Sequence, residues 1–111
     1  MPQDSWYPFD NSGTLGHAGS EGGLILRDEE HSAGARITLE KGSAIAPYAI
    51  TCGIYGHMVR TRFFSLEDEA NPQCDQMKNA LSAIFESGDG STEADSSTFS
   101  QRITAFIEAY P

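Results

Sequence analysis

The sequence predicts an α+β domain in which a four-stranded antiparallel β-meander is followed by two C-terminal helices packed on one face of the sheet. Two observations carry this prediction. Between residues 23 and 66, apolar and polar residues alternate with a period of two, whereas after residue 71 apolar residues recur every three or four positions. Strands and helices in separate blocks are typical of α+β folds. A chain of 111 residues is expected to form one domain.

The first 22 residues show neither period and are rich in Gly, Ser, Asp, Asn and Pro. This composition predicts an irregular N-terminal arm over residues 1–22, followed by a single α+β domain over residues 23–111. Trp6, Tyr7 and Phe9 are the exception within the arm. Large aromatic side chains rarely stay wholly exposed, so packing of this cluster over an edge of the domain is favoured over a docking motif for a partner.

The first two strands are predicted over residues 23–30 and 35–40, joined by a short loop as in a β-hairpin. Their alternation assigns each residue to one face of the sheet. The residues expected to face the core are Leu24, Leu26, Ala35, Ile37 and Leu39, and those expected to face outward include Ile25, Arg27, Glu29, Arg36, Thr38 and Glu40.

The centre of the sheet is predicted to be a hairpin of residues 48–55 and 58–65, joined by Gly56 and His57. A two-residue loop with Gly first suits a type II′ turn, whose twist matches the flanking strands. A shift of one residue would turn two arginines toward the core, which is unfavourable for unpaired charge. The expected pairs are Tyr55 with Met58, Ile54 with Val59, Cys52 with Thr61, and Ile50 with Phe63.

The helices are predicted from caps and apolar stripes. Asn71 followed by Pro72 is typical of an N-cap and first helical position, and Gly88 is a plausible C-terminal stop. After a solvated loop, Thr98 and Gln101 fit a capping box that begins the second helix. The two stripes are Cys74, Met77, Leu81 and Ile84 in the first helix, and Phe99, Ile103, Phe106, Ile107 and Tyr110 in the second.

Charge and composition narrow the class of partner. Sixteen acidic residues against seven basic ones give a net charge of −9, so neither nucleic acid nor an anionic membrane is expected as a partner. No apolar run approaches the roughly 18 residues of a membrane helix, and the first residues lack the basic start and apolar core of a secretory signal. Cys52 and Cys74 are too few for a disulfide framework. A cytoplasmic location with reduced thiols is therefore expected.

No catalytic or metal-binding residues are predicted, and no cofactor is expected. Cys74 and His57 have the chemistry of a nucleophile and its base, but nothing in the sequence brings them together. The acidic run that ends at His31 lies in a predicted strand, whose successive side chains point to opposite faces and cannot converge on one ion. The glycine-rich run over residues 19–23 precedes a strand instead of following one, which argues against a phosphate-binding loop. A non-enzymatic role is favoured.

The outer face of the predicted sheet is the strongest candidate for a functional surface. By the expected registers it carries four of the seven basic residues together with large apolar groups. Arginine beside aromatic residues and Met is typical of interface hot regions. An ordinary solvated face, with Arg27 and Arg36 paired to Glu29 and Glu40, is an equally supported interpretation. The candidate binding residues are Arg27, Arg36, Tyr55, His57, Met58, Arg60, Arg62 and Phe64.

Besides a purely structural subunit whose outer face and N-terminal aromatic residues are both interface, two functions are compatible with this surface. The first is a small binding or regulatory module that uses the outer face to hold an acidic protein partner or a second copy of itself. The alternative is a protein or enzyme that binds a small anionic ligand, with Arg60 and Arg62 as anchors and His57 at the rim.

Overall fold

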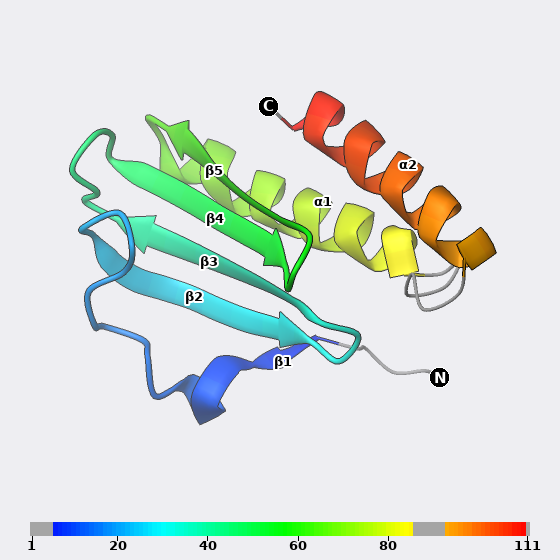
Figure 1. The fold of residues 1–111 in the computed structure, drawn as a ribbon. Coiled ribbons are helices and arrows are strands. Elements are labelled where there is room, and N and C mark those ends of the chain that lie inside the picture. The colour runs from blue at the N-terminus through cyan, green and yellow to red at the C-terminus, as the bar shows by residue number, and fades with distance from the viewer. Residues whose placement is uncertain (1–5, 86–92, 111) are drawn as a thin grey trace.

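In the computed structural model, which describes residues 6–85 and 93–110 apart from the side chains of residues 93–97, five strands form one antiparallel sheet in the order β1-β2-β3-β4-β5 (Figure 1). Two helices cover one face of the sheet, which confirms the α+β class with one strand more than predicted. The elements are β1 (Trp6–Pro8), the 3₁₀ helix η1 (Phe9–Ser12), β2 (Leu24–His31), β3 (Ala35–Lys41), β4 (Tyr48–Ile54), β5 (Met58–Phe64), α1 (Glu67–Phe85) and α2 (Glu93–Ala109).

The additional strand, β1, comes from the segment predicted to be an irregular arm. Trp6 pairs with His31 of β2, and its indole Nε1–H donates a 2.8 Å hydrogen bond to Ser82 Oγ on α1. The Trp6 and His31 rings also meet edge to face, with centroids 5.1 Å apart. The predicted packing of the N-terminal aromatic cluster over an edge of the domain is therefore confirmed for Trp6.

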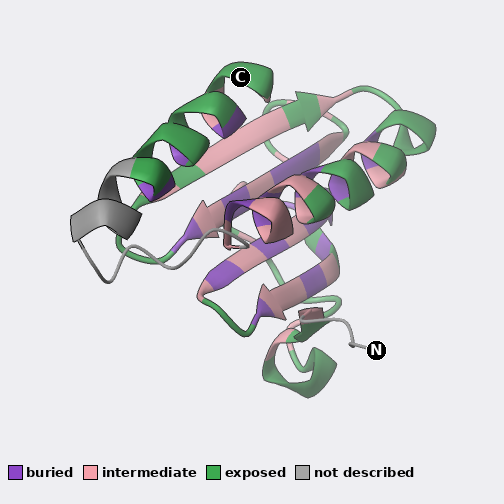
Figure 2. Ribbon diagram, turned by 90° about the vertical axis from the view of Figure 1, so that its right-hand side faces the viewer, coloured by how far each residue is buried: buried purple, intermediate pink, exposed green. Residues whose placement is uncertain are grey.

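The core lies between the helices and one face of β3 and β4 (Figure 2). The alternation predicted for β3 is confirmed, because Ala35, Ile37 and Leu39 are all fully buried. Burial of one such aliphatic side chain contributes about 1.5–3 kcal/mol. Opposite them lie both predicted helical stripes, whose buried members are Cys74, Met77, Leu81, Ile84, Phe99, Ile103 and Phe106.

The predicted register between β4 and β5 is wrong by one residue. Gly56 is the third residue of a turn, with φ of +80°, and the His57 N–H donates to the Ile54 carbonyl at 2.9 Å. This position of Gly suits a type II turn instead of the predicted type II′ turn, and the loop gains a residue. The observed pairs are Ile54 with Met58, Gly53 with Val59, Cys52 with Arg60, Thr51 with Thr61, Ile50 with Arg62, Ala49 with Phe63 and Tyr48 with Phe64.

The shift places Arg60 and Arg62 on the helix-facing side of β5. This placement is tolerated because β5 is the edge strand, where both side chains remain only half-buried. Arg62 also finds polar and aromatic neighbours, since its Nη1–H donates to Gln73 Oε1 at 2.7 Å and its guanidinium lies 5.3 Å from the Tyr110 ring centre. The same shift leaves Val59 and Phe63 on the outer face, 71% and 39% exposed.

The faces predicted for β2 also need correction. Ile25 lies on the outer face as predicted and is buried there, whereas Leu24 and Leu26, which were predicted to face the core, are exposed. A β-bulge between Ile25 and Arg27 shifts the alternation of the residues that follow it. Arg27 and Glu29 face α1, where polar partners replace an apolar core. The Arg27 guanidinium binds Asp75 Oδ1 at 2.8 Å and Glu29 Oε2 at 3.1 Å, and Glu29 also pairs with Lys78.

Both helices begin earlier than predicted. α1 begins at Glu67, so that Pro72 lies inside the helix, and the Leu66 carbonyl accepts the Ala70 N–H at 3.1 Å. The three acidic residues of the first turn favour this start because they face the positive end of the helix dipole. α2 begins at Glu93, which places the predicted capping box within the helix. The predicted stop at Gly88 lies outside the described residues.

Acidification is expected to destabilise the fold through His31. The imidazole is buried beside the rings of Trp6 and Phe85, and burial lowers the pKa of His31 from its usual 6.5. The unfolded chain therefore binds this proton more readily than the folded protein does. The contribution of neutral His31 to stability is present above about pH 6.5 and is lost as the pH falls toward the folded-state pKa.

Urea unfolding measured at several values between about pH 5 and about pH 7.5 tests this expectation. The free energy of unfolding should fall less steeply on acidification for His31→Phe than for the wild type, whereas His17→Gln, at an exposed site, should behave as the wild type. Equal slopes for wild type and His31→Phe would contradict the assignment.

Candidate functional site: a hollow on the outer face of the sheet

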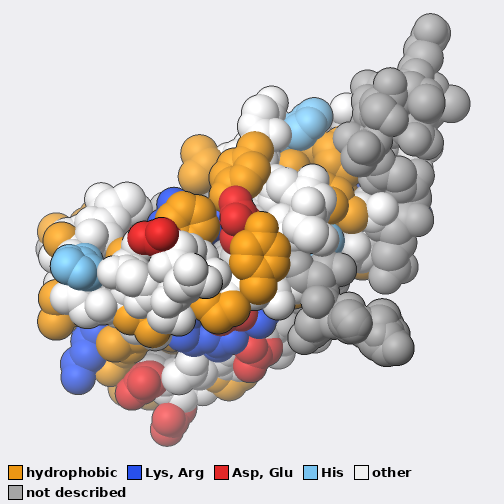
Figure 3. Space-filling model, turned by 90° about the horizontal axis from the view of Figure 1, so that it is seen from below, with side chains coloured by type: hydrophobic (Ala, Val, Ile, Leu, Met, Phe, Trp, Pro, Cys, Tyr) orange, Lys and Arg blue, Asp and Glu red, His pale blue; other side chains and the backbone are white. Residues whose placement is uncertain are grey.

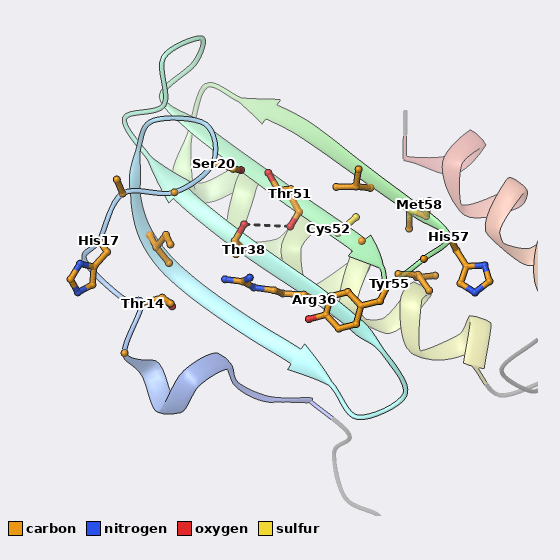
Figure 4. Close-up of a pocket in the computed structure, with 18 residues that line it drawn as sticks. Thr14, His17, Ser20, Arg36, Thr38, Thr51, Cys52, Tyr55, His57 and Met58 are labelled. Atoms are coloured by element: carbon orange, nitrogen blue, oxygen red, sulfur yellow. Dashed lines mark hydrogen bonds between the residues drawn. The ribbon is translucent and has the colours of Figure 1, made fainter.

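A broad hollow of about 1050 Å³ lies on the outer face of the sheet, opposite the helices (Figure 4). Strands β3, β4 and β5 form its floor, the β4–β5 turn forms one end, and arm residues 13–20 form the other. Small-molecule pockets typically measure about 300–1,000 Å³, so this hollow is at the large end of the range.

Glu40 holds the arm against the sheet. It lies on the outer face of β3 and is fully buried. Its carboxylate accepts the Glu21 N–H at 3.2 and 3.3 Å and the Gly23 N–H at 3.0 Å. Gly19 passes so close that a Cβ there would lie 2.3 Å from Glu40 Cδ. The glycine-rich run that cannot be a phosphate loop thus binds a carboxylate of its own chain.

A second anchor joins η1 and the arm to the floor of the hollow. The Arg36 guanidinium donates to both oxygens of Asp28, at 2.8 and 2.6 Å, and the Thr14 hydroxyl donates to the same carboxylate at 2.7 Å. The Phe9 ring stacks on Arg36, with its centre 3.6 Å from the guanidinium carbon. Asp28 is buried, and its hydrogen bond raises the pKa of Arg36. Asp28 therefore accepts the pair of hydrogen bonds that Arg36 could otherwise donate to a ligand.

The floor carries the threonine hydroxyls of Thr38 on β3 and Thr51 on β4, and Thr61 on β5 lies next to them. Thr38 Oγ1 donates to the Thr51 carbonyl at 3.4 Å, and the hydroxyls of Thr51 and Thr61 lie 3.1 Å apart. Gly53 continues β4 without a side chain, so the floor there is backbone. These groups offer hydrogen bonds without net charge to whatever lies on them.

Tyr55 closes the hollow at the hairpin end. Its hydroxyl donates to Glu30 Oε2 at 2.7 Å, and the Tyr7 hydroxyl donates to Glu30 Oε1 at 2.8 Å. These two bonds lower the pKa of Glu30. Desolvation and the Glu30 hydrogen bond raise the pKa of Tyr55 to about 12. Tyr55 is thus a neutral hydroxyl at physiological pH, fixed to β2 by a charged acceptor.

The hollow contains half of the binding residues predicted from the sequence. Arg36, Tyr55, His57 and Met58 line it. Arg27 lies instead beside a smaller hollow of about 260 Å³ between β1, β2 and α1. Arg60, Arg62 and Phe64 lie on the helix-facing side of β5, as a consequence of the one-residue shift. The predicted cluster of four outer-face arginines therefore reduces to Arg36 alone.

Several lining residues were not predicted. Thr38 and Thr51 were assigned to the outer face by their alternation, but a threonine on a solvated face carries no signal of a site. Thr14, His17 and Ser20 belong to the arm, and their proximity to the sheet depends on the buried Glu40 and Asp28. Nothing in the local pattern of residues 13–20 indicates this proximity.

The described cysteine and histidine side chains are not arranged as a nucleophile and its base. Burial raises the pKa of the Cys52 thiol to about 12 and that of the Cys74 thiol to about 11, so both thiols are protonated at neutral pH. His17 and His57 lie at opposite ends of the hollow, as Figure 4 shows. Among the side chains that the structure describes, no group of three His, Cys, Asp or Glu residues could hold a metal ion.

Charged side chains are mixed in sign along the β1–β2 edge. Viewed from that edge, Lys, Arg, Asp and Glu side chains are interspersed among hydrophobic ones (Figure 3). Arg27, Lys78 and Arg36, which lie on or next to β2, are each ion-paired with an acidic neighbour. This edge therefore offers no extended basic surface.

Comparison with known proteins identifies no relative, because no family model, curated protein or solved structure matches the chain. Neither helix, over its described residues, has the combination of length and apolarity needed to cross a membrane. The function must therefore be argued from the geometry of the site.

Proposed function

We propose that this protein is a non-enzymatic binding module whose outer-face hollow holds an extended, uncharged segment of a protein partner. The observation that supports the proposal best is the hollow itself, which is floored by three strands and kept in place by two buried carboxylates of the domain. The cytoplasmic location expected from composition is part of the same proposal.

The shape of the hollow favours an extended segment. A chain lying along the strands can contact the Thr38 and Thr51 hydroxyls, the bare backbone at Gly53, and the exposed side chain of Val59 in turn. Hydroxyl and backbone groups hydrogen-bond a polar ligand, while Val59 and the Tyr55 ring contribute apolar contact. Mixed apolar and polar contact of this kind is the composition of protein interfaces.

The electrostatics favour an uncharged segment over the acidic one predicted from the sequence. Among the residues that the structure describes, Arg36 is the only arginine lining the hollow, and Asp28 accepts both of its parallel hydrogen bonds. An acidic ligand would have to compete with a buried carboxylate and would also meet Glu30 nearby. A small anion anchored by Arg60 and Arg62 is not supported here either, because neither side chain lines the hollow.

Val59→Glu is expected to abolish binding in the hollow without unfolding the domain. Val59 is 71% exposed, so the substitution removes little buried area, but it adds a charge at the floor. Ile45→Glu is the matched control, because Ile45 is 74% exposed and lies outside the hollow. Peptides selected from a random displayed library on the wild-type protein should bind Ile45→Glu normally and Val59→Glu at least about tenfold more weakly.

Amide chemical-shift changes on addition of a selected peptide should then cluster at Thr38, Thr51 and Gly53. A library that yields no peptide distinguishing Val59→Glu from Ile45→Glu would overturn the proposal. A wild-type dimer in light scattering that Val59→Glu converts to a monomer would assign the hollow to a second copy of the chain instead.

A further inference from the structure

A carboxylate on the outer face of β2 lies beside an arginine without forming an ion pair with it. Glu30 is directly opposite Arg36 of β3. Cross-strand neighbours of opposite charge usually attract one another, but the Arg36 guanidinium binds Asp28 instead, at 2.6 and 2.8 Å. Within the part of the chain that the structure describes, no Lys or Arg forms an ion pair with Glu30. Because Asp28 offsets the charge of Arg36, the charge of Glu30 is left without a partner.

Two tyrosine side chains meet at the Glu30 carboxylate. Tyr7 is its cross-strand neighbour on β1 and donates to Oε1 at 2.8 Å, whereas Tyr55 follows β4 and donates to Oε2 at 2.7 Å. The backbone holds Tyr55 in place, because its N–H donates to the Gly34 carbonyl at 2.9 Å. The side chains remain open to solvent, with Tyr7 45% and Tyr55 51% exposed. On this side of the molecule, Figure 3 shows acidic side chains at the surface between hydrophobic ones.

The Glu30 site, formed by Tyr7, Glu30 and Tyr55, has the chemistry of a cation-binding site. The two hydroxyls use two of about four lone-pair positions of the carboxylate, so a further donor can still bind it. The exposed faces of tyrosine rings also attract cations. The two tyrosine hydrogen bonds lower the pKa of Glu30, which is therefore ionised at neutral pH. A neutral ligand would gain neither the ion pair nor the attraction to the rings.

The Glu30 site adjoins the hollow, because Tyr55 belongs to both. Figure 4 shows the Tyr55 ring beside Arg36 at the hairpin end of the hollow. A segment that lies along β4 passes the bare backbone at Gly53 and then meets Tyr55. The next side chain of that segment can cross the Tyr55 ring and reach the Glu30 carboxylate.

We propose that the Glu30 site binds a Lys or Arg side chain of the same partner whose uncharged segment lies in the hollow. The inference rests on the proposed function, because the segment brings the cation to the site. The carboxylate binds the ammonium or guanidinium group, and the tyrosine rings lie against it. The hollow thus selects an uncharged segment, and the Glu30 site fixes the direction and register in which that segment binds.

Peptides selected from the random library on the full-length wild type test this inference. Those that bind Val59→Glu more weakly than Ile45→Glu should carry Lys or Arg at one fixed distance from the uncharged segment. Replacing that residue by norleucine, which keeps an aliphatic chain without the charge, should weaken binding to the wild type about fivefold. The same replacement should weaken binding to Glu30→Gln only about twofold, through the tyrosine rings that remain.

Two controls separate the Glu30 site from the general attraction of an acidic protein for cations. Glu108→Gln removes one exposed carboxylate from α2 and should show the same norleucine effect as the wild type. Tyr7→Phe keeps a ring beside the carboxylate and should retain most of this effect, which Tyr7→Leu should reduce. Both hydrogen bonds of Glu30 lie at the surface and Gln keeps an acceptor, so Glu30→Gln should melt at nearly the wild-type temperature.

The outcomes distinguish this inference from the proposed function. Hollow-binding peptides without a fixed Lys or Arg would overturn the inference and leave the proposed function standing. An equal norleucine effect in the wild type and Glu30→Gln would do the same. A library with no peptide that distinguishes Val59→Glu from Ile45→Glu would overturn the proposed function, and this inference with it.

Discussion

Glu40→Ala is expected to lower the free energy of unfolding by about 3–5 kcal/mol. The substitution leaves the N–H groups of Glu21 and Gly23 without their carboxylate acceptor, and hydrogen bonds to a charged group each contribute about 1.5–3 kcal/mol. Because Glu40 is fully buried, water does not readily replace the lost acceptor. Urea unfolding followed by circular dichroism measures the change, and amide hydrogen exchange should show the Glu21 and Gly23 amides losing protection.

Gly19→Ala provides the matched control for Glu40→Ala. In the wild type the added methyl group meets the Glu40 carboxylate at 2.3–2.6 Å, and overpacking of this kind costs about 1–3 kcal/mol. In the Glu40→Ala background the obstruction is absent, so the two changes should be strongly non-additive. Additive losses, or a loss below about 1 kcal/mol for Glu40→Ala alone, would show that the carboxylate does not hold the arm.

Arg36→Leu is expected to lower the free energy of unfolding by about 3 kcal/mol. It removes the cation that is bidentate to Asp28 and leaves a buried carboxylate with only the Thr14 hydroxyl as a side-chain donor. Breaking one side of a fully buried ion pair costs about 3–5 kcal/mol. The lower figure applies here because the Arg36 side chain is 35% exposed and solvent screens the pair in part.

The double substitution Asp28→Leu with Arg36→Leu separates a broken ion pair from a loss of packing. Replacing both partners by apolar side chains is often neutral, so the double variant should be more stable than Arg36→Leu alone. Chemical unfolding of the three proteins gives the comparison. A double variant no more stable than Arg36→Leu would mean that the loss comes from contacts of Arg36 other than the charge pair, such as the stacking of Phe9 on its guanidinium.

Both changes test the same structural idea, that the hollow exists because the arm is tied to the sheet. Glu40 binds residues 21–23, and the Asp28–Arg36 pair binds Thr14 and Phe9. Weakening either anchor is therefore expected to reduce peptide binding in the hollow even at temperatures where the domain stays folded.

The β3 strand and the two helical stripes could be predicted from the sequence because each buries one whole face. Burial of one face of a strand leaves apolar residues at every second position, as in Ala35, Ile37 and Leu39. Burial of one face of a helix leaves them three or four positions apart, as in Met77, Leu81 and Ile84. Tyr55 and Arg36 were predicted correctly as outer-face residues by the same rule. Periodicity alone was therefore sufficient for the α+β class and for part of the candidate site.

Periodicity was not sufficient to predict the register of β5, because an edge strand tolerates polar residues on the side that faces the helices. The register of β5 depends on which residue of the turn adopts a positive φ, and Gly56 is compatible with either the second or the third turn position. The expected free-energy cost of burying Arg60 and Arg62 did not apply, because β5 is an edge strand in which both side chains stay half-buried. Arg62 also donates a hydrogen bond to Gln73 and lies over the Tyr110 ring. In β2, one bulge and the polar partners on α1 reversed the faces in the same way.

By itself the sequence determined the order of β2 to β5 and of the two helices, the core residues of β3 and of the helical stripes, and the absence of a recognisable catalytic motif, because these follow from local periodicity and spacing. Only the tertiary structure decided the hollow. Glu40 has the pattern of an exposed strand residue, and it is buried only because a loop about twenty residues earlier folds over it. Contacts between distant segments leave no periodic signal, and such contacts between the arm and the sheet made the hollow.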